Sequence, residues 1–191
     1  MKEIIKLGVI LALITAIAAA GLAAVYSVTK PRIEEQKQKA LQAALTQALP
    51  QSPAEAIEPV ETEGTVSYYI GYESPAKENI SGYAFLARGP GYSSVIETMV
   101  GVDTAGEIIG MKVLDQKETP GLGTKVEEIR YGENDPWFLR QFMEKKAGQL
   151  AVDKDGGEIT SITGATISAR ALTNSVVKGY QELRTRVEKL P

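Results

Sequence analysis

Residues 160–168, Thr-Ser-Ile-Thr-Gly-Ala-Thr-Ile-Ser, place five hydroxyl side chains within nine positions, with a Gly-Ala pair among them. From Leu172 to Leu190, an apolar residue then recurs every three or four positions, which is typical of an amphipathic helix. The start of a helix leaves backbone N–H groups without partners, and these groups and the helix dipole favour an anion. The stretch therefore predicts an anion-binding turn at the head of a long C-terminal helix.

Three interpretations of this turn remain open from the residues alone. Ser161 or Thr163 can cap the helix, and a cap requires no ligand. The backbone N–H groups can instead hold a phosphate group without a covalent bond. Finally, the Thr166 hydroxyl can be a point of covalent attachment, because the helix end stabilises a phosphate charge placed there.

A second unusual stretch, Glu118-Thr119-Pro120-Gly121-Leu122-Gly123, places two glycines and a proline around one leucine. Such a run continues neither a strand nor a helix, so it predicts a shaped loop whose backbone closely approaches another group. The apolar Leu122 side chain then suits the face of a flat ring, although an ordinary strand-to-helix connection has the same composition. The Gly89–Tyr92 turn fits a ligand loop and a hairpin turn equally well.

The 191-residue chain contains neither cysteine nor histidine. It therefore offers no thiolate or imidazole for an iron–sulfur cluster, structural zinc or common haem ligation. A Ser–His or Cys–His nucleophile pair is excluded for the same reason. The net charge of −3 argues against a nucleic-acid partner. Any redox chemistry must be carried by an organic cofactor.

The N-terminal part of the chain reads as a membrane anchor and a stalk. Leu7–Thr29 holds 23 residues without a charge, a helix of about 34 Å that spans a bilayer core. A retained anchor is favoured over a cleaved signal peptide, because the apolar run is long and helix-like sequence continues beyond it. We predict a transmembrane anchor over 1–30, then a helical stalk and a loop over 31–63. In the stalk, Arg32–Leu49 follows Pro31 as a second helix or a bent continuation of the first, and it packs on the domain. Pro50–Glu63 is the loop.

The remaining residues, 64–191, predict an α+β domain. Four runs rich in β-branched and aromatic residues predict an antiparallel meander, and they are Thr65–Tyr72, Gly82–Ala87, Ser94–Asp103 and Ile108–Leu114. A helix with Asp135 as its N-cap follows, and its aromatic face is more typical of a core than of a cofactor wall. Residues 150–159 then predict a last hairpin, which leads into the C-terminal helix.

Thr163-Gly164-Ala165-Thr166 resembles the flavinylation motif of bacterial FMN-binding domains. With the Glu118–Gly123 loop, the single anchor and the β-rich start, the whole chain resembles the G-subunit family of Rnf electron-transport complexes. It is similar, less specifically, to the homologous C subunit of sodium-pumping NADH:quinone reductases. The resemblance implies one FMN per chain, linked by a phosphoester to Thr166 by a dedicated FMN transferase.

The resemblance also implies roles for other residues. It implies no metal and no catalytic side chain, and the chain acts as a redox subunit of a larger translocase rather than alone. Thr163, Gly164 and Ala165 shape the turn and supply N–H donors. Glu118, Thr119 and Leu122 line the isoalloxazine or ribityl region, Gly121 also belongs to the cofactor-binding set, and Trp137 lies nearby. The implied partners are the other membrane and peripheral subunits of an ion-translocating ferredoxin:NAD oxidoreductase. The implied location is the inner membrane, crossed once, with the flavin domain on the extracytoplasmic side.

One residue departs from the family pattern. Thr160 stands three residues before the motif, where the family usually has aspartate, which implies slower modification or a contribution from Glu158. Two other functional classes also fit the residues. These are a membrane-anchored binding or scaffold module without a redox role, and a flavin-binding membrane regulator.

Overall fold

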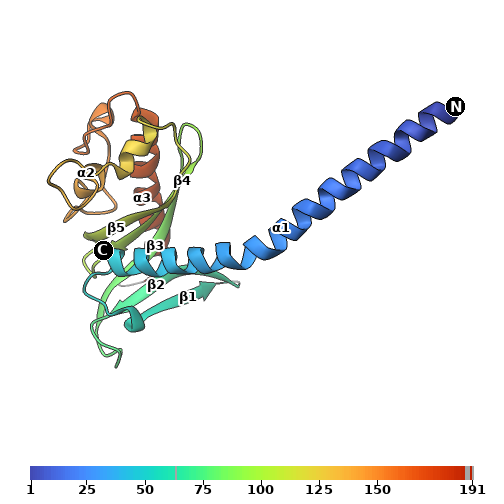
Figure 1. Cartoon of the computed structure of the whole chain (residues 1–191). Helices are drawn as coiled ribbons and strands as arrows, with labels where there is room; N and C mark the ends of the chain where they lie inside the picture. Colours follow the sequence, from blue (N-terminus) through green and yellow to red (C-terminus); the bar gives the residue numbers. More distant parts are fainter. Residues whose placement is uncertain (63, 188–189, 191) are drawn as a thin grey trace. The chain divides into compact units, whose positions relative to one another are not determined.

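The computed structural model describes residues 1–62, 64–187 and 190, in two compact units, residues 1–40 and residues 41–191. Helix α1 (Lys2–Ala48) runs from the first unit into the second (Figure 1). It continues through Pro31, so of the two forms predicted for the stalk, a separate helix and a continuation, the continuation is observed.

The first unit consists of helix alone, and its side chains are exposed. Two of its hydroxyls are satisfied within the helix, since Thr15 donates to the carbonyl of Leu11 and Ser27 donates to that of Ala24. In the part of the chain that the structure describes, α1 is the one helix both long and apolar enough to cross a membrane. An exposed apolar helix of this length is consistent with the predicted anchor.

The second unit is built on a five-stranded antiparallel sheet in which each strand pairs with the next along the chain (Figure 1). The strands are β1 (Ile57–Thr62), β2 (Thr65–Tyr72), β3 (Ile80–Pro90), β4 (Val95–Val102) and β5 (Ile108–Asp115). The four predicted strands and their meander are confirmed.

The predicted loop over Pro50–Glu63 is wrong, because it contains strand β1. The three prolines in this stretch suggested a loop. Pro59, however, lies in β1 at the edge of the sheet, where a residue without an N–H group is tolerated. The strand pairs with β2 over its whole length, opposite Thr65 to Gly71.

Each face of the sheet is covered by one helix. Helix α3 (Thr166–Arg186) packs on β3 and β4. Its predicted apolar stripe is buried throughout, although Val187 and Leu190 lie beyond the last helical residue. The end of α1 covers the other face, where Leu45, Ala48 and Leu49 pack with residues such as Met99. The prediction that the stalk packs on its own domain is confirmed for residues 41–49.

Two cross-strand glycines let α1 approach the sheet closely. Gly101 of β4 pairs with Gly110 of β5. A Cβ atom at Gly101 would lie 1.9 Å from the carbonyl oxygen of Ala48, and one at Gly110 would lie 2.2 Å from that of Gln47. The end of α1 therefore rests directly on the backbone of two strands.

Gly101→Ala is expected to lower the free energy of unfolding by about 1–3 kcal/mol, the usual cost of inserting a methyl group into a filled space. Urea unfolding of the full chain in detergent, followed by the fluorescence of the single tryptophan, measures the change. Gly21→Ala is the control, because no atom of the described residues, apart from its chain neighbours and the adjacent helix backbone, lies within 4 Å of a Cβ there. Equal stability of Gly101→Ala and the parent chain would contradict the close approach.

The segment between β5 and α3 differs from two sequence predictions. Helix α2 is a single turn, Trp137–Arg140, and its N-cap is Pro136 without a side-chain hydrogen bond, so the predicted Asp135 cap is wrong. The aromatic face is core as expected, since Phe138 and Phe142 are fully buried.

The predicted antiparallel hairpin over residues 150–159 is also wrong. Val152 and Ile159 form an isolated parallel bridge around the short 3-10 helix Asp153–Asp155. The carboxylate of Asp153 accepts hydrogen bonds from the N–H groups of Lys154 and Ser161, so the chain folds around this side chain. This local competition of an aspartate with strand pairing explains the error.

Candidate functional site

The two unusual stretches of the sequence line one cavity of about 640 Å³. This volume lies in the usual range of small-molecule sites, about 300–1,000 Å³. The lining residues come from the β3–β4 turn, the loop after β5 and the start of α3, and they are Tyr92, Glu118, Thr119, Leu122, Gly123, Gly164, Ala165, Thr166, Ile167 and Ser168. Six of the nine residues predicted to bind the cofactor are thereby brought together.

Thr166 is the first residue of α3 and lies half-buried at the cavity wall. The turn before it depends on Gly164, whose φ of +80° suits a residue without a side chain. Ala165 then closes the turn by donating its N–H to the carbonyl of Ile162, 2.9 Å away. The Thr166 hydroxyl is thus presented on a fixed turn.

The predicted side-chain cap of α3 is not observed. Its N-cap residue is Ala165, whose methyl side chain cannot accept a hydrogen bond. The first N–H groups of α3 therefore have neither an intrahelical acceptor nor a capping side chain. Such groups, beside a hydroxyl in a cavity, suit a phosphate group.

The Glu118 side chain is the most strongly bound group at the cavity. It is only 4% exposed. Its Oε1 accepts from the N–H groups of Ser93 and Ser94, each at 2.9 Å, and from the Ser94 hydroxyl at 3.1 Å. Its Oε2 accepts from the N–H of Tyr92 at 3.0 Å and from the Ser168 hydroxyl.

Two opposing causes act on the pKa of Glu118. Burial raises the pKa, but the hydrogen bonds from Ser168, Ser93, Tyr92 and Ser94 outweigh it and hold the pKa at about 2. Hydrogen bonds to the charged form favour that form. The cavity wall therefore contains a permanent carboxylate at physiological pH.

Three exposed apolar side chains surround the cavity. Tyr92 is 72% exposed, Ile167 is 50% exposed and Leu122 is 42% exposed, and all three line the cavity wall. Large apolar side chains left in water around a cavity mark a surface that binds something apolar. The flat-ring contact predicted for Leu122 is compatible with this position.

Three of the predicted residues lie elsewhere. Thr163 and Trp137 line a second cavity of about 490 Å³. There the Arg130 guanidinium lies 3.9 Å from the Trp137 ring centroid, and the indole N–H donates to Glu128 at 3.0 Å. Gly121 lines neither of these two cavities, and its φ of +73° shows that it shapes the loop.

Four lining residues were absent from the sequence-based set, namely Tyr92, Gly123, Ile167 and Ser168. Each belongs to a stretch that drew attention, but composition alone did not show which of its side chains face the cavity. For Tyr92 the signal was the Gly89–Tyr92 stretch. Its first two residues end β3, its last two lie in the turn between β3 and β4, and Tyr92 lines the cavity.

The surroundings of Thr160 bear on its departure from the family pattern. Thr160 is exposed, and its main chain is held by the amide of Gln141. Glu158 is paired with Lys145 at 2.6 Å. Ser161, the residue after Thr160, is bound by the carboxylate of Asp153, which accepts a hydrogen bond from the Ser161 N–H at 3.0 Å.

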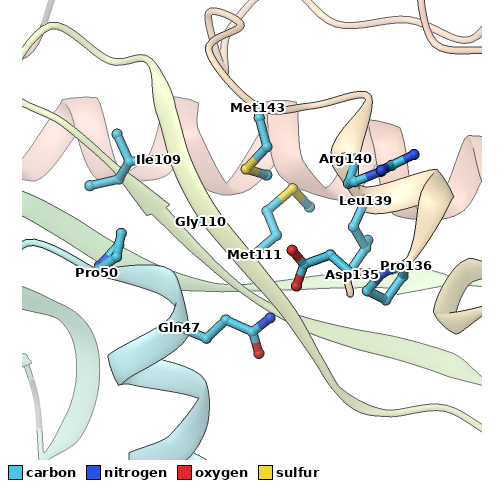
Figure 2. Close-up of a pocket in the computed structure, with 10 residues that line it drawn as sticks. All are labelled: Gln47, Pro50, Ile109, Gly110, Met111, Asp135, Pro136, Leu139, Arg140 and Met143. Atoms are coloured by element: carbon cyan, nitrogen blue, oxygen red, sulfur yellow. The ribbon is translucent and has the colours of Figure 1, made fainter. Parts of the chain in front are cut away.

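A further cavity, of about 210 Å³, shares no lining residue with the Thr166 cavity (Figure 2). The side chains of Met111 and Met143 point toward each other at its centre, and Asp135 lies beside them (Figure 2). Gln47, from the end of α1, lies at the near edge (Figure 2). Its small volume and mixed lining indicate packing between α1, β5 and α2 rather than a ligand site.

Comparison with known sequences gives two family matches. The model of the FMN-binding domain matches residues 91–181, which include both stretches that line the Thr166 cavity. The model of the RnfG N-terminal region matches residues 1–48, which are α1 and the residue before it.

Individual relatives agree with these matches. The chain is similar to the G subunit of the ion-translocating oxidoreductase complex of Pseudoalteromonas atlantica, with 34% identity over 92% of this chain and 86% of the relative. It is similar to the protein of the same name from Methanosarcina acetivorans, with 32% identity over 92% of each. Among solved structures, Shewanella oneidensis NqrC matches 63% of this chain and 60% of its own, with 22% identity and a TM-score of 0.48.

Proposed function

Because this chain belongs to the G-subunit family of ion-translocating oxidoreductase complexes, we propose that it carries one FMN linked to Thr166 by a phosphoester. It thereby passes electrons within such a complex, an ion-translocating ferredoxin:NAD oxidoreductase. One observation carries the proposal. Thr166, the last residue of the Thr163–Thr166 motif, opens α3 at the wall of a cavity inside the region matched by the FMN-binding domain.

The residues around Thr166 fit such a group. The uncapped N–H groups at the start of α3 suit the phosphate, and the exposed side chains of Tyr92, Leu122 and Ile167 suit the ring. Gly164 lies close to Leu122, since a Cβ atom at Gly164 would be 3.2 Å from a side-chain atom of Leu122. The absence of a side chain at Gly164 therefore leaves the space between Leu122 and the turn open. An apolar wall and a phosphate-binding helix end on one cavity support a flavin nucleotide over a simple anion.

When bound, FMN supplies the electron-transfer chemistry, and the chain supplies position and environment. In the attachment step, the Thr166 oxygen forms a bond to the phosphorus of the FMN phosphate. The bond between that phosphorus and the AMP part of an FAD donor breaks, and AMP leaves with the hydroxyl proton, so the chain gains one FMN less one water. The start of α3 would hold the phosphate charge, and Tyr92, Leu122 and Ile167 would supply the apolar surface for the ring.

Covalent attachment has a physical advantage at this site. The cavity is rimmed by exposed side chains, so a ligand held only by contacts would exchange with solvent. A phosphoester prevents this loss and lets the ring edge remain open to an electron-transfer partner. We place the domain on the extracytoplasmic side of the inner membrane, where no FMN pool would refill an emptied site.

The full chain, co-expressed with an FMN transferase, tests the proposal directly. Intact mass spectrometry is expected to show one FMN less one water, and denaturing electrophoresis is expected to show a band that fluoresces under ultraviolet light. A colourless chain of unmodified mass from cells that contain an active transferase would refute the covalent flavin. It would favour the alternative, a membrane-anchored binding module without a redox role.

A further inference from the structure

We propose that Glu118 is a positioning residue that holds the three walls of the cavity together and fixes the turn that presents Thr166. The proposal rests on the proposed function, since it concerns how the flavin site is assembled. It replaces the expectation that the Glu118 side chain contacts the cofactor directly.

The hydrogen bonds of Glu118 join segments that are far apart in the sequence. The carboxylate belongs to the loop after β5, and it binds the β3–β4 turn 26 residues earlier and Ser168 of α3 50 residues later. These three segments supply the ten residues that line the cavity. One side chain therefore connects all three walls.

The carboxylate has no remaining capacity for a ligand. A carboxylate offers about four lone-pair sites, and three N–H groups and two hydroxyls already donate to this one. A buried charge is tolerated only when it is satisfied in this way. Glu118 lines the cavity wall, but both of its carboxylate oxygens are engaged in hydrogen bonds within the protein.

The backbone is packed closely around this carboxylate. A Cβ atom at Gly91 would lie 2.6 Å from Glu118 Oε1, and one at Gly123 would lie 2.7 Å from Oε2 and from the Ser168 hydroxyl oxygen. The glycines on both sides thus let the turn and the loop close on one carboxylate. The Glu118 carboxylate and its donors are therefore packed too closely to admit water, unlike an ordinary surface ion pair.

The contact acts on the groups that meet the cofactor. Tyr92 places its exposed ring at the cavity while its own N–H is held by Glu118. Ser168 lies two residues after Thr166 in the first turn of α3, so its bond to Glu118 fixes the direction in which that turn begins. Loss of the hydrogen bonds to Glu118 therefore loosens both Tyr92, whose ring forms part of the cavity wall, and the turn that presents the Thr166 hydroxyl.

Glu118→Gln tests this role in the full chain, because glutamine keeps the shape but places an amide N–H₂ among N–H donors. Using FAD as flavin donor and an FMN transferase, we expect kcat/KM for flavin attachment to fall about tenfold, as for loss of one hydrogen bond to a charged group. In the fraction that does become labelled, we expect iodide to quench the flavin more strongly than in the parent chain.

Matched variants separate the possible causes. Glu58→Gln removes the same charge from an exposed pair with Lys77 and is expected to match the parent chain. Ser168→Ala removes one donor only and is expected to shift both readouts in the same direction by less. If Glu118→Gln does not fold, the test rests on Ser168→Ala. A Ser168→Ala variant with the kcat/KM for attachment and the iodide quenching of the parent chain would then overturn the proposal.

The outcomes also distinguish this inference from the proposed function. A parent chain that takes up no flavin overturns the proposed function itself. A labelled parent chain with a Glu118→Gln variant of equal rate and equal quenching overturns only the positioning role. A lower labelled fraction with unchanged quenching would show that Glu118 merely stabilises the fold, which also overturns it.

Discussion

Replacing Thr166 by valine is expected to abolish covalent flavin attachment completely. Valine has nearly the shape of threonine but no hydroxyl, so the oxygen that bonds to the phosphorus is lost. Thr166 is the first residue of α3 and makes no side-chain cap there, so the helix and the cavity are expected to keep their form. Intact mass and in-gel fluorescence after co-expression with the transferase measure the result.

The same stretch offers matched controls. Thr160 carries the same side chain, lies outside the Thr163–Thr166 motif and is exposed, so Thr160→Val is expected to retain the flavin. Thr166→Ser keeps a hydroxyl and is expected to retain part of the labelling. A fluorescent band of parental strength in Thr166→Val would assign the linkage to another residue.

The sequence was most informative where the local composition permits few backbone conformations. The Thr160–Ser168 turn and the Glu118–Gly123 loop were both recognised by unusual local composition, and both line the same cavity. Four of the strands were also predicted, because β-branched and aromatic residues gather in runs separated by turn residues. These features depend on neighbours in the sequence, so a single sequence shows them.

The errors have an equally physical origin. Pro59 suggested a loop because a proline disrupts a central strand, but β1 lies at the edge. Asp135 was expected to cap a helix, and Asp153 took over a segment expected to be a hairpin. For Pro59 the deciding factor was the position in the sheet, and for residues 150–159 it was the hydrogen bonds of one side chain, neither of which a local pattern contains.

Glu118 shows the same limit most clearly. Its neighbours in the sequence suggested a ligand loop, and the residue itself was expected to contact the cofactor. Its partners are Tyr92 to Ser94 and Ser168, which no spacing rule connects to it. Only the folded chain shows that this carboxylate is used within the protein.

That use has a measurable consequence in acid. The pKa of Glu118 is lowered from 4.5 to about 2 in the folded chain. A carboxyl group with a depressed pKa in the folded state stabilises the protein above its unfolded pKa, and this contribution is lost as the pH falls toward the folded value. The shift corresponds to about 3 kcal/mol of stability, present above pH 4.5 and nearly gone at pH 2.

Glu118→Gln is therefore expected to remove this pH-dependent part of the stability. At pH 6 the variant is expected to be less stable than the parent chain by about 3 kcal/mol, and the difference should shrink toward zero as the pH approaches 2. Urea titrations at a series of pH values, followed by the fluorescence of Trp137, measure both curves.

Other acidic groups titrate in the same range but cancel in the comparison. Hydrogen bonds from Ser161, Arg170 and Lys145 lower the pKa values of Asp153, Asp155 and Glu158 respectively. These carboxylates are present in both chains, so only the Glu118 contribution separates the two curves. A stability difference that stays constant from pH 6 to pH 2 would mean that Glu118 acts through packing rather than as a bound carboxylate. A converging difference would identify the charge itself as the group that holds the three walls of the cavity together.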